Sequence, residues 1–413
     1  MSRKLLLLSM VLSVLLCSSL VVSVNAASMW SRTYGGTGGE KAYSLVSTSD
    51  GGYAIAGIWN YSYYSDWFIS YFWGDFWLVK IDEFGDMKWN KTYGGQGYDM
   101  AYSLVATSDG GYAIAGAWNY TIDLVFGTVN ADCWLVKTDS LGNMQWNHTY
   151  GEGFAYSLVA TSDGGYAIAG ITNGDFWLLK TDAFGNMEWN RTYGGTGDDI
   201  ANSLMATSDG GYAIAGATDY FGSNDSWLVK TDSLGNMQWN HTYGGIGSDW
   251  ANSLIAAPEG GYIMAGSFTN SFGMGEYWLV KTDESGNMQW NKTYGGFGQE
   301  ACSVVATPDG GYAIVGDDGV WLVKTDEFGN KEWWERYMGM GVSEACSVVA
   351  TPDGGYAIAG ATESAGDFDC WLIKTDEHGI VPEYSSLLVP ALVLTATAFI
   401  IINKKRLLHK RSQ

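Results

Sequence analysis

Carboxylates recur at one place in this sequence. Each lies shortly after a "TYGG" segment or a variant of it and just before a short apolar run; the set is Glu40, Asp99, Asp199, Asp249, Glu300 and Glu344. Ca²⁺ takes several oxygen ligands, so carboxylates gathered in a ring could hold it. The alternative is that each carboxylate is solvated or accepts backbone N–H groups of its own glycine-rich connector.

Aromatic residues crowd two longer segments, residues 58–76 and 117–133. The first holds Trp59, Tyr61, Tyr64, Trp67, Tyr71 and Trp73, and the second holds Trp118 and Tyr120. Amphipathic aromatic side chains at this density suit contact with a sugar or a peptide. The competing interpretation is a hairpin extension that packs on itself.

Motifs of established catalytic chemistry are absent from the sequence. It has no HExxH, GxSxG, CxxC or Walker segment, and its four histidines are His148, His241, His378 and His409. No cofactor is expected apart from the Ca²⁺ considered above. Since a carboxylate pair can serve a glycosidase, a polysaccharide-active hydrolase or lyase stays open as an alternative function.

The elements that position these residues are written as a repeat. Three signatures each occur seven times, spaced by roughly 45 to 60 residues, which is typical of repeat architectures. "DGGY" begins at Asp50, Asp109, Asp163, Asp209, Glu259, Asp309 and Asp353. "WLVKTD" or a variant begins at Trp77, Trp134, Trp177, Trp227, Trp278, Trp321 and Trp371. "WNxTYGG" begins at Trp30, Trp89, Trp146, Trp189, Trp239, Trp290 and, degraded, at Trp334.

Each unit reads as four short strands, here named a, b, c and d. In the fourth unit they are residues 201–207, 211–216, 226–231 and 237–243, bounded by Gly, Asp or Asn. This pattern favours a propeller over a solenoid. The last unit lacks strand d, and an unpaired copy at residues 30–36 opens the repeats. We therefore expect an all-β, seven-bladed β-propeller closed by the N-terminal strand, plus one C-terminal transmembrane helix.

Length variation is concentrated between strands b and c. Because strands alternate in direction, the b–c loops and the d–a connectors should emerge on one face of the disc. Loops carried by a rigid scaffold commonly bind ligands. The aromatic segments 58–76 and 117–133 are the two longest b–c loops and belong to neighbouring units.

The two ends of the chain predict export and anchoring. Residues 1–26 read as a signal peptide and 27–380 as the propeller. Residues 381–402 read as a linker and a membrane span from Tyr384 to Ile402, followed by a basic cytoplasmic tail at 403–413. All 44 acidic but only 15 of the 22 basic residues lie between 27 and 383, so that part carries 15 − 44 = −29. Such a charge disfavours nucleic acid as a partner.

Sequons occur at Asn60, Asn90, Asn119, Asn147, Asn190, Asn224, Asn240 and Asn291, which glycans could occupy outside the cell. Cys302 and Cys346 hold the same strand-a position in adjacent units. They are expected either as a bridge between blades or as reduced thiols.

The "WLVKTDxxGNxxW" hairpin resembles the repeat of quinoprotein-like propellers, and the Gly-Gly-Tyr run is similar to that of kelch repeats. The combination "TPDGGYxIxG…WLVKTDxxG", with a "VPEYSSLLVPALVL…KKR" tail, resembles exported archaeal and bacterial repeat proteins with a membrane anchor. The resemblance implies a cell-surface propeller that binds an extracellular glycan, peptide or surface protein. A purely structural role in the cell envelope is the remaining interpretation.

Overall fold

The computed structural model describes residues 29–381, except 66–69, 96, 124–127, 221–222, 246, 272, 296–299, 318, 340 and 365. These residues contain β-strands and no helix, and residues 30–380 form one compact unit. No helix within the described range could cross a membrane. The transmembrane helix of the expected architecture is therefore no part of the fold seen here, and residues 384–402, like the expected signal peptide, lie outside the described residues.

The strands follow the four-part repeat. The a strands are β2 (Gly39–Ser47), β6 (Tyr98–Ala106), β10 (Phe154–Ala160), β14 (Asp199–Ala206), β18 (Trp250–Ala256), β22 (Ala301–Ala306) and β26 (Ser343–Ala350). The b strands are β3 (Tyr53–Ser65), β7 (Tyr112–Asp123), β11 (Tyr166–Thr172), β15 (Tyr212–Tyr220), β19 (Tyr262–Thr269), β23 (Tyr312–Gly316) and β27 (Tyr356–Ser364).

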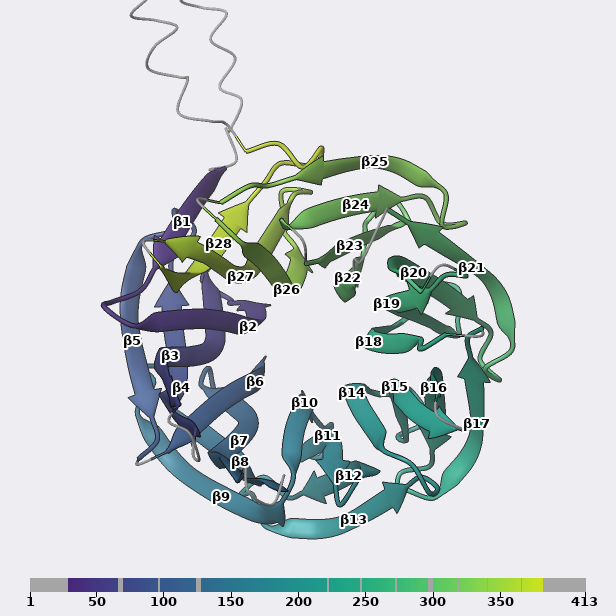
Figure 1. Ribbon diagram of the computed structural model, residues 1–413, viewed down its shortest axis with the longest axis horizontal. Coiled ribbons are helices and arrows are strands. Elements are labelled where there is room, and N and C mark those ends of the chain that lie inside the picture. Colours follow the sequence, from purple (N-terminus) through teal and green to yellow (C-terminus); the bar gives the residue numbers. More distant parts are fainter. Residues whose placement is uncertain are drawn as a thin grey trace, which may run out of the picture. The chain divides into compact units, whose positions relative to one another are not determined.

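The c strands are β4 (Ser70–Ile81), β8 (Thr128–Thr138), β12 (Asp175–Thr181), β16 (Ser223–Thr231), β20 (Gly275–Thr282), β24 (Trp321–Thr325) and β28 (Asp367–Lys374). The d strands are β1 (Trp30–Tyr34), β5 (Met87–Tyr93), β9 (Met144–Glu152), β13 (Met187–Tyr193), β17 (Met237–Tyr243), β21 (Met288–Tyr294) and β25 (Lys331–Arg336). The a strands are innermost and the d strands outermost (Figure 1).

The sheets correct the expected blade count. The described strands form five separate four-stranded sheets and one eight-stranded sheet, so the prediction of seven separate blades is wrong. The eight-stranded sheet carries the first two repeats. It arises because β4 pairs in parallel with β6 through Gly74 and Tyr98. The long aromatic hairpin of the first repeat thus reaches the second repeat, which the periodic strand pattern does not reveal.

The chain closes on itself as the orphan strand predicted. β1 pairs antiparallel with β28 over five residues, from Trp30 opposite Lys374 to Tyr34 opposite Cys370. The indole of Trp371 donates to Ser31 Oγ at 2.7 Å, and the indole of Trp30 donates to the Glu83 carbonyl at 3.1 Å. The N-terminal strand is therefore the outermost strand of the last sheet.

The contacts in the a–b turn explain why the same residues recur there in every repeat. In the turn between β6 and β7, the backbones of Thr107 and Gly111 pair, and Gly110 adopts a φ of 82°, which a side chain would disfavour. Asp109 accepts the Thr107 hydroxyl and the Gly111 N–H, and its carboxylate lies 2.8 Å from Lys137 Nζ. An Asp or Glu holds a c-strand lysine in this way in every repeat.

The core lies between sheets. Small residues such as Ala167 and Ala169 on strand b let the next sheet approach, and its Ile214 and Trp227 pack against them. The tryptophans at the heads of strands c and d, such as Trp227 and Trp189, thus pack between sheets. One register assignment was wrong: Trp333, not Trp334, takes the d-strand tryptophan position opposite Lys324. Trp334 is 46% exposed and contacts the Trp321 ring.

Candidate ligand-binding surface

A ring of serine hydrogen bonds joins the innermost strands. Ser103 Oγ accepts the backbone N–H of Leu158 on the next a strand at 3.0 Å. Equivalent bonds of 3.0–3.2 Å join Ser44 to Leu104, Ser157 to Leu204, Ser203 to Leu254, Ser253 to Val304, Ser303 to Val348 and Ser347 to Leu45. The last of these spans the two ends of the repeat region. The inner wall is thus a continuous hydrogen-bonded scaffold.

A β-bulge beside each serine frees one residue of every a strand from the ladder. The register shifts between Ala101 and Ser103, for example, so that Tyr102 has no partner on β7. The freed residues are Tyr43, Tyr102 and Tyr156 in the first three repeats, Asn202 and Asn252 in the next two, and Cys302 and Cys346 in the last two. All seven are partly exposed. The ring of a strands, here called the inner wall, therefore has a tyrosine, an asparagine and a cysteine sector, named after the residue at this position.

Side chains at this position touch from one strand to the next. The rings of Tyr43 and Tyr102 lie 5.3 Å apart, and those of Tyr102 and Tyr156 lie 5.2 Å apart. Asn202 Nδ2 donates to Asn252 Oδ1 at 3.2 Å. Cys302 and Cys346 form no disulfide. Only the tyrosine sector therefore offers a run of aromatic faces.

The tyrosine sector continues towards the b–c loops. Phe154 stacks on Tyr156 with centroids 5.8 Å apart and an interplanar angle of 8°, and Tyr120 lies 5.8 Å from Phe154. The Tyr98 ring lies 5.7 Å from the Tyr120 ring. Tyr61, like Tyr98 and Tyr120, packs against a buried apolar cluster of Ile58, Met100, Ala117 and Ala131. We call Tyr43, Tyr61, Tyr98, Tyr102, Tyr120, Phe154 and Tyr156 the aromatic surface. Its members are neither fully buried nor fully exposed.

Burial sets the protonation of this surface. It raises the pKa of Tyr98 and of Tyr156 to about 12 and raises the pKa of Tyr102 well above its ordinary value, and neighbouring tyrosines add to the effect. These phenols stay neutral at physiological pH. They present aromatic faces and O–H groups that can donate or accept hydrogen bonds.

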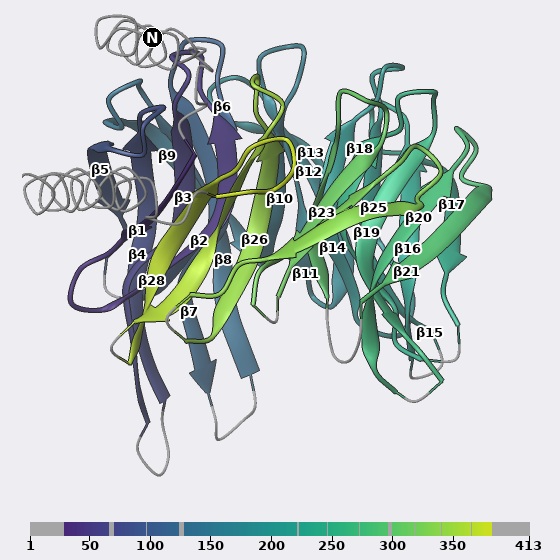
Figure 2. The same ribbon diagram turned by 90° about the horizontal axis from the view of Figure 1, so that it is seen from above.

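The structure divides the eight aromatic residues predicted to bind a ligand. Tyr61 and Tyr120 belong to the aromatic surface, whereas Trp59 and Trp118 pack against the buried Trp77 and Trp134 at centroid distances of 5.1 and 6.2 Å. Trp73 is 46% exposed. Trp67 and the side chains of Tyr64 and Tyr71 lie outside the described part. The β3–β4 and β7–β8 hairpins that carry these segments extend beyond the other hairpins of this face (Figure 2).

The predicted acidic ring separates into two registers. Glu40, Asp99, Asp199 and Asp249 are buried. Glu300 and Glu344 lie one residue further along their repeats, directly before the buried Ala301 and Ala345. Asp99 accepts the N–H of Gly95 at 3.2 Å and of Asn119 at 2.7 Å, fastening the d–a connector to the b–c loop. Glu40 and Asp249 are bonded alike, and Glu344 pairs with Lys41 at 2.8 Å. The alternative interpretation of backbone bonding holds for Glu40, Asp99 and Asp249.

Burial opposes the charge of the fastening carboxylates. It raises the pKa of Asp99 and of Asp249, while the backbone donors lower it in part. Among the residues that the structure describes, no three His, Cys, Asp or Glu side chains form a group that could hold a metal ion. Ca²⁺ in an acidic ring therefore gains no support from this geometry.

The sequons lie at accessible positions. Asn60, Asn90, Asn119, Asn147, Asn190, Asn240 and Asn291 are exposed and Asn224 is partly exposed. The outer-strand members also make structural bonds: Asn147 Oδ1 accepts the Trp134 indole N–H at 3.1 Å. Glycosylation at these sites stays a prediction.

Sequence reasoning missed the three inner tyrosines Tyr43, Tyr102 and Tyr156. The available signal was the "A-x-S" segment of strand a, in which x changes from Tyr to Asn to Cys while its neighbours stay constant. A residue that varies between two fixed positions of an inner strand takes no part in the sheet-to-sheet packing that the repeat requires. The side chain of such a residue is expected at the surface of the inner wall.

Comparison with known proteins supports the fold and nothing finer. No family model and no curated protein matches the chain. Among solved structures, Sqt1 from Chaetomium thermophilum superposes with a TM-score of 0.51 at 12% identity, over 84% of this chain and 98% of that one. A second Sqt1 structure gives 0.49 at 12% identity, over 84% and 99%. At this identity the first likeness shows that the repeats build a β-propeller.

Proposed function

We propose that this protein is a binding module of the cell surface whose aromatic surface contacts a peptide or protein segment. The aromatic surface is the observation that carries the proposal. Tyrosines are enriched in protein interfaces because they supply large, rigid contact area at a low cost in conformational entropy. The neutral phenols of Tyr98 and Tyr156 add hydrogen-bonding groups without requiring a counter-charge.

The scaffold suits such a role. The serine-bonded a strands hold Tyr43, Tyr102 and Tyr156 in place, so little freedom is lost when a ligand binds. The long aromatic hairpins stand beside them and would extend the contact. A strongly acidic exported part favours a partner segment with basic residues.

The repeats themselves suggest a substitution that tests this proposal. Asparagine takes the Tyr102 position in two other repeats, so Tyr102→Asn combined with Tyr156→Asn should preserve the fold. The purified full chain would select peptides from a displayed random library, and fluorescence titration would then measure their affinities. We expect the double variant to raise the dissociation constant at least about tenfold, because the loss of even one good aromatic contact has an effect of this size.

A matched control lies in the cysteine sector. Cys302→Ser with Cys346→Ser alters the same wall position and should leave peptide affinity unchanged. Equal affinity of the tyrosine variant and the wild type would contradict the proposal. A glycan array probed in parallel covers the other expected ligand class, and glycan binding without any peptide enrichment would contradict a protein partner.

Cell-surface location belongs to the same proposal. The N-terminal segment that reads as a signal peptide and the acidic composition of residues 27–383 support it. Protease added to intact cells should digest the repeat region, because that region would face the exterior. Full protection in intact cells, with digestion after lysis, would contradict this location.

A further inference from the structure

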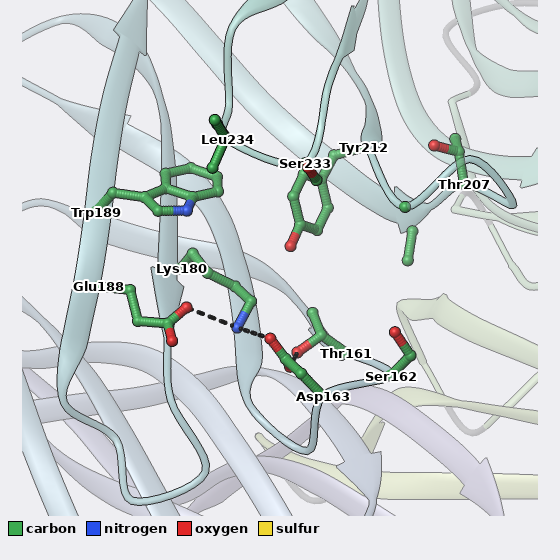
Figure 3. A pocket seen from close by; sticks show the side chains of 12 residues that line it. Thr161, Ser162, Asp163, Lys180, Glu188, Trp189, Thr207, Tyr212, Ser233 and Leu234 are labelled. Carbon is green, nitrogen blue, oxygen red and sulfur yellow. Dashed lines mark hydrogen bonds and ion pairs between the residues drawn. The ribbon is translucent and has the colours of Figure 1, made fainter.

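A pocket opens between two sheets on the face of the a–b turns, away from the aromatic hairpins. Its volume is about 560 Å³, and its lining includes Asp163, Lys180, Glu188, Trp189 and Tyr212 (Figure 3). The first four residues belong to one sheet or its turn, and Tyr212 comes from the next sheet. The pocket therefore exists only because two repeats meet.

A chemically matched pocket recurs three repeats later. It measures about 500 Å³ and is lined by Asp309, Lys324, Glu332, Trp333 and Tyr356 among others. Lys324 Nζ lies 2.7 Å from Asp309 and 3.0 Å from Glu332. The same five residue types thus build both pockets.

The ammonium group of Lys180 in the first pocket has a partner for each of its N–H groups. Lys180 Nζ lies 2.8 Å from Asp163 Oδ2, 3.0 Å from Glu188 Oε2 and 2.8 Å from the Thr181 carbonyl, which occupies its three N–H groups. One cation therefore faces two carboxylates, and the group carries one negative charge in excess. Glu188 Oε1 has no protein donor among the described residues.

A buried phenol points into the same space. Tyr212 as a whole is only 3% exposed, but its hydroxyl lines the pocket, where solvent reaches it. Figure 3 shows this hydroxyl directed into the pocket. The d-strand tyrosines behave differently, since Tyr193 donates to the Gly235 carbonyl at 2.6 Å. The hydroxyl is therefore available to a ligand that enters the pocket.

The glutamate distinguishes these two junctions from their neighbours. At the equivalent place the other outer strands carry Gln145, Gln238 and Gln289, or Lys88 and Met29. Lys230 bonds Gln238 Oε1 at 3.1 Å and Asp209 at 2.7 Å, so that junction is neutral. The excess negative charge is therefore a property of the Glu188 and Glu332 pockets and not of the repeat itself.

We propose that these two pockets each bind a guanidinium group, such as an arginine side chain of a peptide. A guanidinium can fork onto the free side of the Glu188 carboxylate and balance the excess charge. It can donate to the Tyr212 hydroxyl and lie against the indole of Trp189. The Glu188 side chain is 45% exposed, so the carboxylate is reachable from solvent.

The direct test is calorimetric titration of the full chain with N-acetyl-arginine amide. N-acetyl-citrulline amide, a neutral isostere, serves as the ligand control. We expect two sites for the arginine compound, each with a dissociation constant of about 1 mM, and none for the citrulline compound. Affinity should fall as ionic strength rises from about 0.05 to about 0.5 M, because added salt screens the charge pair.

Variants test the assignment of the two sites. Glu188→Gln recreates the neutral junction found elsewhere in this chain and should leave one site; adding Glu332→Gln should leave none. Gln145→Glu should create a third site, a gain that loss of folding cannot mimic. Equal binding of citrulline, full binding by the double glutamine variant, or no third site would each overturn the proposal. Equal affinity for N-acetyl-lysine amide would overturn the choice of guanidinium.

Discussion

The seam between the first and last strands gives the sharpest test of the fold. Tyr34 is 7% exposed, and its hydroxyl donates to the Gly85 carbonyl at 2.8 Å. Tyr34→Phe removes the donor and leaves a buried carbonyl unsatisfied, which should lower the free energy of unfolding by about 1–3 kcal/mol. Trp30, at 6% exposure, packs edge-on to Tyr53. Trp30→Ala should cost about 3–5 kcal/mol, as do large-to-small changes of buried tryptophan.

An internal junction supplies the matched control. Tyr193 is also 7% exposed and donates to the Gly235 carbonyl at 2.6 Å, far from either end of the repeats. If β1 seals the ring as firmly as an internal strand, Tyr34→Phe and Tyr193→Phe should shift the urea midpoint alike. Far-ultraviolet circular dichroism would follow unfolding of the full chain. A normal midpoint for Trp30→Ala and Tyr34→Phe, beside a loss for Tyr193→Phe, would refute closure by β1.

Three further predictions concern the repeat as a scaffold. The hydrogen bond from Lys230 lowers the pKa of Asp209 to about 2, so this carboxylate stabilises the fold above its ordinary pKa of 3.8 and loses that contribution as pH falls towards 2. Since its carboxylate is half exposed, Asp209→Asn should remove only about 1 kcal/mol at pH 7 and flatten the acid limb of a thermal-melt series; an unchanged acid limb would contradict the pairing. Cys133 is fully buried and burial raises the pKa of its thiol, so a thiol reagent should label it only after unfolding, and rapid labelling of the native protein would contradict its position. A Cβ at Gly116 would overlap the Met100 carbonyl oxygen, so Gly116→Ala should lower the melting temperature by more than 5 °C, which for a unit spanning residues 30–380 corresponds to about 4 kcal/mol; an unaltered melting temperature would contradict this close approach.

Much of the secondary structure follows from local residue patterns. The "SDGG" turn needs glycine at a positive φ, and alternating small and large residues in "YAIAG" suit a strand buried between sheets. The orphan copy at residues 30–36 and the missing copy after Trp371 indicate ring closure, because an unpaired strand edge requires a partner. These inferences depend on neighbours along the chain, which a sequence displays directly.

The contacts between repeats, in contrast, depend on how the sheets pack in three dimensions. Tyr102 meets Tyr43 and Tyr156 because a bulge releases it from its own ladder and the serine bonds bring adjacent inner strands together. The same closeness joins β4 to β6 and merges the first two repeats into one sheet.

The candidate sites were least predictable for the same reason. Trp59 looked like a ligand contact in sequence, but the alternation of its strand turns it onto the Trp77 ring. The sequence analysis did not single out Glu188, which shares a lysine with Asp163 and lines a pocket together with Tyr212 of the next sheet. Strand patterns depend on residues close together in the sequence, whereas this pocket is formed by side chains of two repeats that only the packing of one sheet against the next brings together.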